Sequence, residues 1–211
     1  MATRRNEQGQ VVAEFAIISL VLVLIVAFAV DFGVANAQRS RMTQIIQQAE
    51  AECALPATAL KVKNSTNPGH VMTTALIDTL REDGFTGEIT AYYYEPTKAE
   101  LGFTDAYWNT HRIYIYGVYA QGHAQTMFSI GTGAMLMPIN VRTWEHSVSY
   151  SNERTWRPSD SGVQPDNGYM HVGDGEPSSV GVWTNVMSLN ESVMPGGNAA
   201  KDEAITEAMK H

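Results

Sequence analysis

The sequence is short of cysteine and lacks the common catalytic motifs. Cys53 is the single cysteine among 211 residues, which excludes an intrachain disulfide; most lone cysteines are small buried apolar residues, although a bond between subunits remains open. No Gly-x-Ser-x-Gly, His-Glu-x-x-His, Cys-x-x-Cys or phosphate-loop pattern occurs. The six histidines include no pair at helical spacing. We therefore expect no enzyme, no catalytic residue, no metal site and no cofactor.

Basic residues are scarce in the larger part of the chain. From residue 43 onward there are 10 Lys and Arg against 19 Asp and Glu, and the formal net charge of the chain is −8. Nucleic acids and anionic lipid surfaces select basic patches, so we expect neither as a partner of this part. Asp160, Asp166, Asp174 and Glu176 offer oxygen ligands for calcium, but EF-hand spacing is absent. Solvated loop carboxylates are the commoner explanation.

What the sequence does contain is one long apolar run, residues 11–30, in which Glu14 is the only charged residue. About 20 mainly apolar residues suffice to cross a ~30 Å hydrocarbon core, so the run predicts a membrane-spanning helix. A carboxylate there costs on the order of 3 kcal/mol, so Glu14 either reaches the interface or has a partner. Arg4 and Arg5 precede the run, which predicts a cytoplasmic N-terminus and an acidic domain outside.

Gly9 stands five residues before Glu14, behind a basic leader and ahead of the apolar run. This arrangement resembles a type IV prepilin, and the pair Glu14-Phe15 most resembles the TadE-like pseudopilins of tight-adherence (Tad, Flp-type) pili. In that family a membrane aspartyl prepilin peptidase cuts after the glycine. The resemblance implies cleavage between Gly9 and Gln10, with Glu14 as the fifth residue of the mature chain.

The resemblance also implies a structural function. It predicts a membrane-anchored minor pilin or pseudopilin that takes part in assembling an adhesive pilus. Its partners would be prepilin peptidase, the Tad inner-membrane assembly platform, and other pilin subunits through the N-terminal helix, where Glu14 would meet a neighbour's free N-terminal amine. The predicted head is far larger than that of the short major Flp pilins, which favours an initiating, tip or accessory role.

A second processing site competes with this interpretation. Ala35-Asn36-Ala37 has the small-x-small form that signal peptidase accepts, and cleavage before Gln38 would release a secreted or envelope-bound binding protein. An ordinary signal peptide is disfavoured by the charged residues Glu14 and Asp31 and by the length of the apolar region. The first residue of the mature chain distinguishes the two.

The first helix is expected to continue beyond the span. Residues 31–54 contain no proline, and apolar residues recur at helical spacing between Met42 and Cys53, with Glu50 and Glu52 placed mostly on the opposite polar face. Pro56 ends the run. A helix over residues 11–54 would be about 66 Å long. Asn67 and Pro68 then predict the start of a second helix, which Gly84 closes.

Strand signals follow at residues 89–94, 112–120 and 135–150. The second is apolar or aromatic on both faces, as expected for a strand covered on two sides. In the third, the apolar phase shifts between Val141 and Trp144, which predicts a bulge or two short strands. A turn of helix is expected around Met127 and Phe128. The aromatic residues Tyr92, Tyr93, Tyr94, Tyr107 and Trp108 are interpreted mainly as core, with a glycan-binding patch as the alternative.

From residue 155 the chain is rich in proline and glycine and is expected to be extended and partly mobile, with residues 180–183 as an edge strand or docked loop and residues 198–210 of helix-forming composition. The predicted fold is α+β: a long N-terminal transmembrane pilin-like helix, a small head with one helix on a short antiparallel sheet, and a loop-rich tail. The predicted divisions are leader 1–9, helix 10–54, head 55–154 and C-terminal region 155–211.

Overall fold

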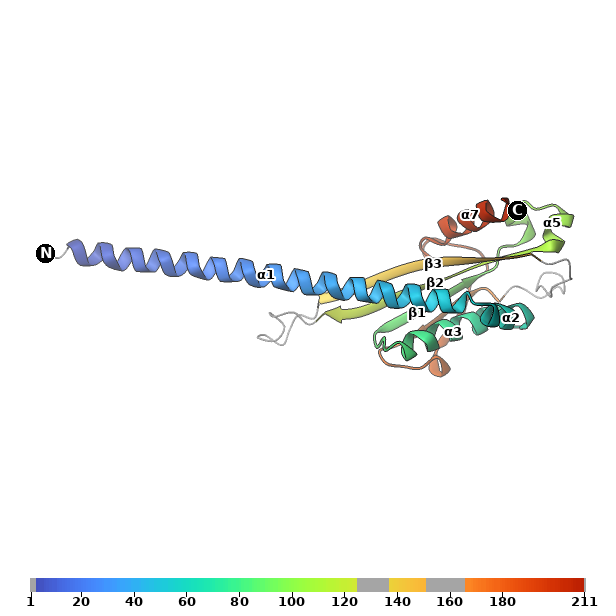
Figure 1. Cartoon of the computed structure of the whole chain (residues 1–211), viewed down its shortest axis with the longest axis horizontal. Coiled ribbons are helices and arrows are strands. Elements are labelled where there is room, and N and C mark those ends of the chain that lie inside the picture. The colour runs from blue at the N-terminus through green and yellow to red at the C-terminus, as the bar shows by residue number, and fades with distance from the viewer. Residues whose placement is uncertain (1–2, 125–136, 151–165, 211) are drawn as a thin grey trace. The chain divides into compact units, whose positions relative to one another are not determined.

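The computed structural model describes residues 3–124, 137–150 and 166–210 (Figure 1). They form two units, one of residues 1–40 and 123–139 and the other of residues 41–122 and 140–211, each described by itself. The helices are α1 (Thr3–Cys53), α2 (Pro56–Asn64), α3 (Pro68–Glu82), α4 (Lys98–Leu101), α5 (Asp105–Thr110), the 3₁₀ helix η2 (Ser178–Val180) and α7 (Gly197–Ala208). The strands are β1 (Glu88–Tyr94), β2 (His111–Ala124), β3 (Met137–Tyr150), β4 (Gly168–Val172) and β5 (Val182–Asn185).

Helix α1 is continuous over 51 residues, which confirms the long helix predicted from the sequence. No proline interrupts it until Pro56, whose fixed φ suits the first turn of α2 instead. The helix begins at Thr3, so most of the predicted leader is helical as well. Short helix α2 was not anticipated.

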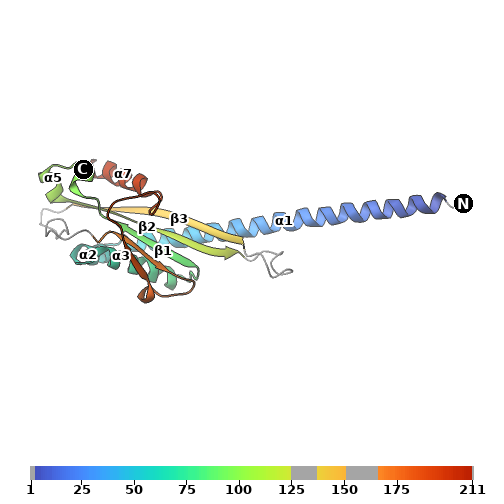
Figure 2. The same ribbon diagram turned by 180° about the vertical axis from the view of Figure 1, so that it is seen from behind.

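The second unit is built on a five-stranded antiparallel sheet in the order β3-β2-β1-β4-β5, with α3 and residues 41–53 of α1 on one face and α7 on the other (Figures 1 and 2). Tyr92 belongs to a core cluster that contains Ala200 and Ala204 of α7. On the opposite face, the Tyr116 hydroxyl donates to the Glu50 carbonyl oxygen of α1 over 3.3 Å. Side chains alternate between the two faces along a strand, and successive residues of β2 are buried, so both of its faces are covered. The apolar and aromatic residues on both faces of β2 predicted this.

Helix α3 begins and ends where its sequence predicted. Asn67 is its N-cap residue and Pro68 its first, although the Asn67 side chain makes no capping hydrogen bond. Gly84, at φ +83°, adopts the left-handed conformation, and the Phe85 amide then donates to the Leu80 carbonyl over 2.9 Å. The helix buries an apolar face of Met72, Leu76, Ile77 and Leu80 against the sheet.

Strand β3 is one uninterrupted element, so the predicted alternative of two short strands is wrong, and a bulge is not needed to explain the apolar pattern. Thr143 points to α1 and bonds Glu50, whereas Trp144 stacks on Tyr92 of the α7 face. Val141 shares the face of Thr143 by alternation. The apolar phase shifts because the two halves of the strand fill cores on opposite faces of the sheet.

The sheet extends beyond residue 154, where the sequence prediction placed the end of the head. Strand β4 pairs antiparallel with β1, matching Ala91 with Met170, and β5 pairs with β4 as the predicted edge strand. These strands have five and four residues, too short for a clear periodic signal, and their pairing partners lie far away in the sequence. The turn of helix expected around Met127 and Phe128 lies outside the described residues.

Candidate membrane-anchoring and assembly site

Residues Gln10–Cys53 of α1 include a segment long and apolar enough to cross a membrane. An 18-residue window within it has a mean hydropathy of 2.9, and none of that window is buried. The uncovered side chains surround the helix, with Phe15 71% exposed and Ile18, Leu22 and Ile25 all exposed. A core helix would be covered by its own protein, and burial of each such side chain is worth about 1.5–3 kcal/mol. The segment is thus uncovered by the rest of the described chain and suited to an apolar environment such as a membrane.

The predicted site residues lie at the start of the apolar segment. The Gln10 side-chain amide donates to the Glu14 carboxylate over 3.2 Å, one helical turn away. Phe15 follows directly and is exposed. Gly9 precedes Gln10 in the same helix. The structure thus places the predicted cleavage bond within one turn of the carboxylate.

The other end of α1 carries a second carboxyl group in the opposite environment. Glu50 is 1% exposed and accepts a hydrogen bond from the Thr143 hydroxyl over 2.5 Å. Burial raises the pKa of Glu50 to about 7, although the bond from Thr143 lowers it and the nearby Glu145 raises it further. The sequence analysis placed Glu50 on the polar face, which is wrong, because β3 packs over that side of the helix.

Cys53 lies three residues further along and is buried. Burial raises the pKa of its thiol to about 11, despite a hydrogen bond with Thr79 that lowers it. A buried thiol with so high a pKa has little thiolate at neutral pH. Cys53 is thus the small buried residue that its isolation in the sequence favoured.

The acidic residues considered for calcium are not brought together. Asp166 accepts hydrogen bonds from the backbone and the ring of His70, with its Oδ2 3.0 Å from His70 Nδ1. Asp174 and Glu176 lie beyond the other end of β4, and Asp160 is outside the described residues. Within the described ranges, no group of three or more His, Cys, Asp or Glu residues is placed to hold a metal ion.

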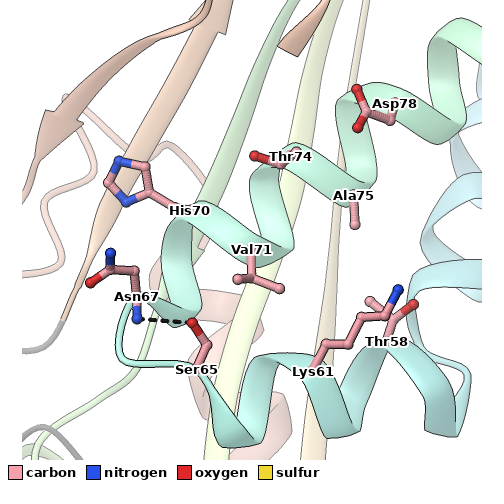
Figure 3. A pocket seen from close by; sticks show the side chains of 9 residues that line it. All are labelled: Thr58, Lys61, Ser65, Asn67, His70, Val71, Thr74, Ala75 and Asp78. Atoms are coloured by element: carbon pink, nitrogen blue, oxygen red, sulfur yellow. Dashed lines mark hydrogen bonds between the residues drawn. The ribbon is translucent and has the colours of Figure 1, made fainter. Parts of the chain in front are cut away.

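A groove of about 460 Å³ lies between α2 and α3 (Figure 3). Lys61 of α2 lines one side, and Thr74 and Asp78 of α3 line the other. Asp78 accepts a 2.5 Å hydrogen bond from Ser178, and His70 is held by Asp166, so the two ionisable groups that α3 contributes to the groove already have partners in the fold. We assign no function to this groove.

The aromatic cluster belongs to the core. Tyr92, Tyr93, Tyr94 and Trp108 are buried. Tyr107 packs against the same core, and its hydroxyl donates to the Ala208 carbonyl at the end of α7. Tyr92, Tyr94, Tyr107 and Trp108 pack in the core between the sheet and α7, whereas Tyr93 packs against Tyr114. The main interpretation of these residues as core is therefore confirmed.

A long, uncovered apolar helix followed by an α+β head is the arrangement of the class of membrane-anchored proteins, and the helix suggests such an anchor here. The family model described as TadE-like protein matches residues 9–49. The matched segment begins at Gly9 and ends one residue before Glu50. The resemblance to the TadE-like family is therefore confirmed over this segment, and it indicates a protein related to the minor pilins of the Tad pilus. No curated protein and no solved structure matches the chain.

Proposed function

We propose that the protein is a minor pilin or pseudopilin that is processed by prepilin peptidase and takes part in assembling an adhesive Tad-type pilus. The observation that carries the proposal is the uncovered apolar stretch of α1, residues 11–30, which contains Glu14 near its start and lies inside the TadE-like match. A helix that is apolar on all sides gains stability both in lipid and in a bundle of like helices. The same segment therefore serves as an anchor before assembly and as a packing surface during it.

Processing would occur between Gly9 and Gln10. The new N-terminal amine would lie one turn from the Glu14 carboxylate, on the residue whose side chain already donates to that carboxylate. Two charges in an apolar setting are stable only when paired, so Glu14 would bind its own amine or that of a neighbouring subunit. Pairing between subunits would fix the axial register of two packed helices.

The proposed orientation follows from charge. Arg4 and Arg5 keep the N-terminus in the cytoplasm, where the peptidase and the assembly platform would meet the leader. The acidic head would then lie outside. A five-stranded head suits a subunit that initiates the filament, lies at its tip or acts as an accessory subunit. Other pilins would contact this subunit through α1.

The test is the mature N-terminus. Co-expression with a Tad-type prepilin peptidase should remove residues 1–9 and leave Gln10 first, as measured by mass spectrometry of the intact membrane protein. Gly9→Val should block this cleavage, while the matched substitution Gly33→Val, at a helical glycine with no neighbouring atom within 4 Å of an added Cβ, should not. A mature chain that begins at Gln38 would establish the secreted alternative instead.

A further inference from the structure

The two edges of the head sheet differ in how they are protected. Strands β3 and β5 are the outermost strands, so the outward backbone groups of each have no neighbouring strand in the described sheet. Natural proteins block such edges with proline and charged side chains. Strand β3 carries Pro138, Arg142 and Glu145, whereas residues 177–190, which contain β5, include no charged residue at all.

The register shows which backbone groups β5 presents. The Val186 amide donates to the Asn167 carbonyl over 2.8 Å, so this pair is of the hydrogen-bonded type. Such pairs alternate in antiparallel sheets, so Thr184 and Val182 also bond to β4. The amide and carbonyl groups of Trp183 and Asn185 therefore point away from β4, to the open edge.

Several apolar side chains at this edge are exposed. Val182 is 66% exposed on one face of β5, and Val180 and Met187 are exposed just outside it. Trp183, on the other face, stacks on His70 with ring centroids 4.2 Å apart, which holds β5 against α3. The edge is thus fixed in an extended conformation before any partner arrives.

Charges near the two ends of β5 indicate what can pair with it. In β4, His171 lies opposite Val182, and Asp174 comes three residues after His171. At the other end, Gly168 lies opposite Asn185, and Asp166 comes two residues before Gly168. No Lys or Arg occurs between Asp166 and Lys201 in the sequence. Arg81, which bonds the carbonyls of Gly173 and Glu176, offsets part of the charge at the first end, and His70 bonds Asp166 at the second.

We propose that β5 is a docking edge for an extended segment of another protein, with an uncharged centre and basic residues at its ends, which adds a sixth strand to the sheet. A second copy of this chain fits poorly, because antiparallel pairing of two β5 strands would bring acidic ends together. The proposal concerns the head and does not depend on the processing or assembly of α1. Since β5 has four residues, a few hydrogen bonds form and the Kd should be about 0.1–1 mM.

The probe is the synthetic peptide Lys-Thr-Val-Thr-Val-Lys, added to the full chain in detergent micelles. Amide exchange measured by NMR should slow at Trp183 and Asn185 and remain unchanged at Val182 and Thr184, which already bond to β4. Val182→Lys should weaken binding at least tenfold. Its matched control Asn140→Lys, at an exposed residue of the β3 edge, should leave binding unchanged.

Two further peptides separate backbone pairing from other contacts. N-methylation of the peptide amides removes the donors and should abolish binding, and replacement of both lysines by glutamate should weaken it at least tenfold. Equal binding of the N-methylated peptide, or protection of all four β5 amides alike, would overturn the proposal. Protection of Trp183 and Asn185 that rises with protein concentration in the absence of peptide would show a second copy as the occupant and would also overturn it.

Discussion

Helix α1 contains two stretches that differ in what covers them. Residues 11–30 are apolar and uncovered, whereas Met42, Ile46, Ala49 and Cys53 are buried in the head. Each stretch contains a glutamate: Glu14 is exposed among apolar side chains and Glu50 is buried beneath Thr143. The comparison teaches that one uninterrupted helix can carry two interfaces, one completed by the chain itself and one left for lipid or other subunits.

The largest effect is expected at Glu14. Glu14→Ala leaves the amine of a neighbouring subunit without its partner. An uncompensated buried charge costs roughly 3–5 kcal/mol, which lowers the association constant by at least about 100-fold. Membrane insertion should be unchanged or improved, because the span becomes more apolar. The measurement is the amount of the variant in sheared pili and in pull-downs of partner pilins. Glu14→Gln should be intermediate.

Glu52 provides a matched control for that experiment. Gln48 donates to Glu52 over 3.2 Å, as Gln10 does to Glu14, with the same spacing in the same helix. Glu52 lies outside the apolar segment, so Glu52→Ala should leave pilus incorporation at the wild-type level. Wild-type incorporation of Glu14→Ala as well would refute the assembly role of Glu14.

Truncation of the head end of α1 should come next in size. Ile46 is fully buried, and Ile46→Ala should lower the free energy of unfolding by roughly 2–5 kcal/mol through lost burial and a cavity. Ile18→Ala removes the same atoms from an exposed position of the span and should change head stability by less than about 0.5 kcal/mol. Urea unfolding in micelles, followed by tryptophan fluorescence, measures both. Equal losses would show that the two stretches are not independent.

The smallest of these effects is the pH dependence from Glu50. Its folded-state pKa, about 7, lies above the ordinary glutamate pKa of 4.5, so the folded state holds the proton more tightly. The stability that this provides is complete below pH 4.5 and is lost as the pH rises to about 7, which amounts to roughly 3 kcal/mol. Glu50→Gln should remove this fall in unfolding free energy between pH 4.5 and 7.

Glu52→Gln, on the exposed face, should retain the pH dependence of the wild type and serves as the control. A Glu50→Gln variant whose stability still falls by the wild-type amount over this range would show that another group causes it. The comparison of the two variants thus tests whether burial of the head end of α1 is what sets the titration of Glu50.

Much of the local structure was predictable from the sequence, and the residues show why. Pro68 and Gly84 bound α3 through their own backbone preferences, and the apolar residues of β2 predicted a strand covered on both faces. The phase shift in β3 predicted a bulge or two short strands, because a local pattern does not show that Thr143 and Trp144 meet partners on opposite faces of the sheet. The placement of Glu50 failed for a similar reason, since a helical pattern shows which residues are apolar but not how many neighbours surround the helix.

The long helix, its apolar segment and the motif of Gly9 and Glu14 can be predicted from sequence alone, because they depend on residues close together in the chain. Only the tertiary structure decided that β4 and β5 extend the sheet, that Asp166 holds His70, and that β5 forms an uncharged edge. Those outcomes depend on pairing between residues far apart: Asp166 and His70 are separated by 96 positions. Sheet order, and with it the identity of an edge strand, is set by which distant strands bury each other's backbone groups, and no local pattern encodes that choice.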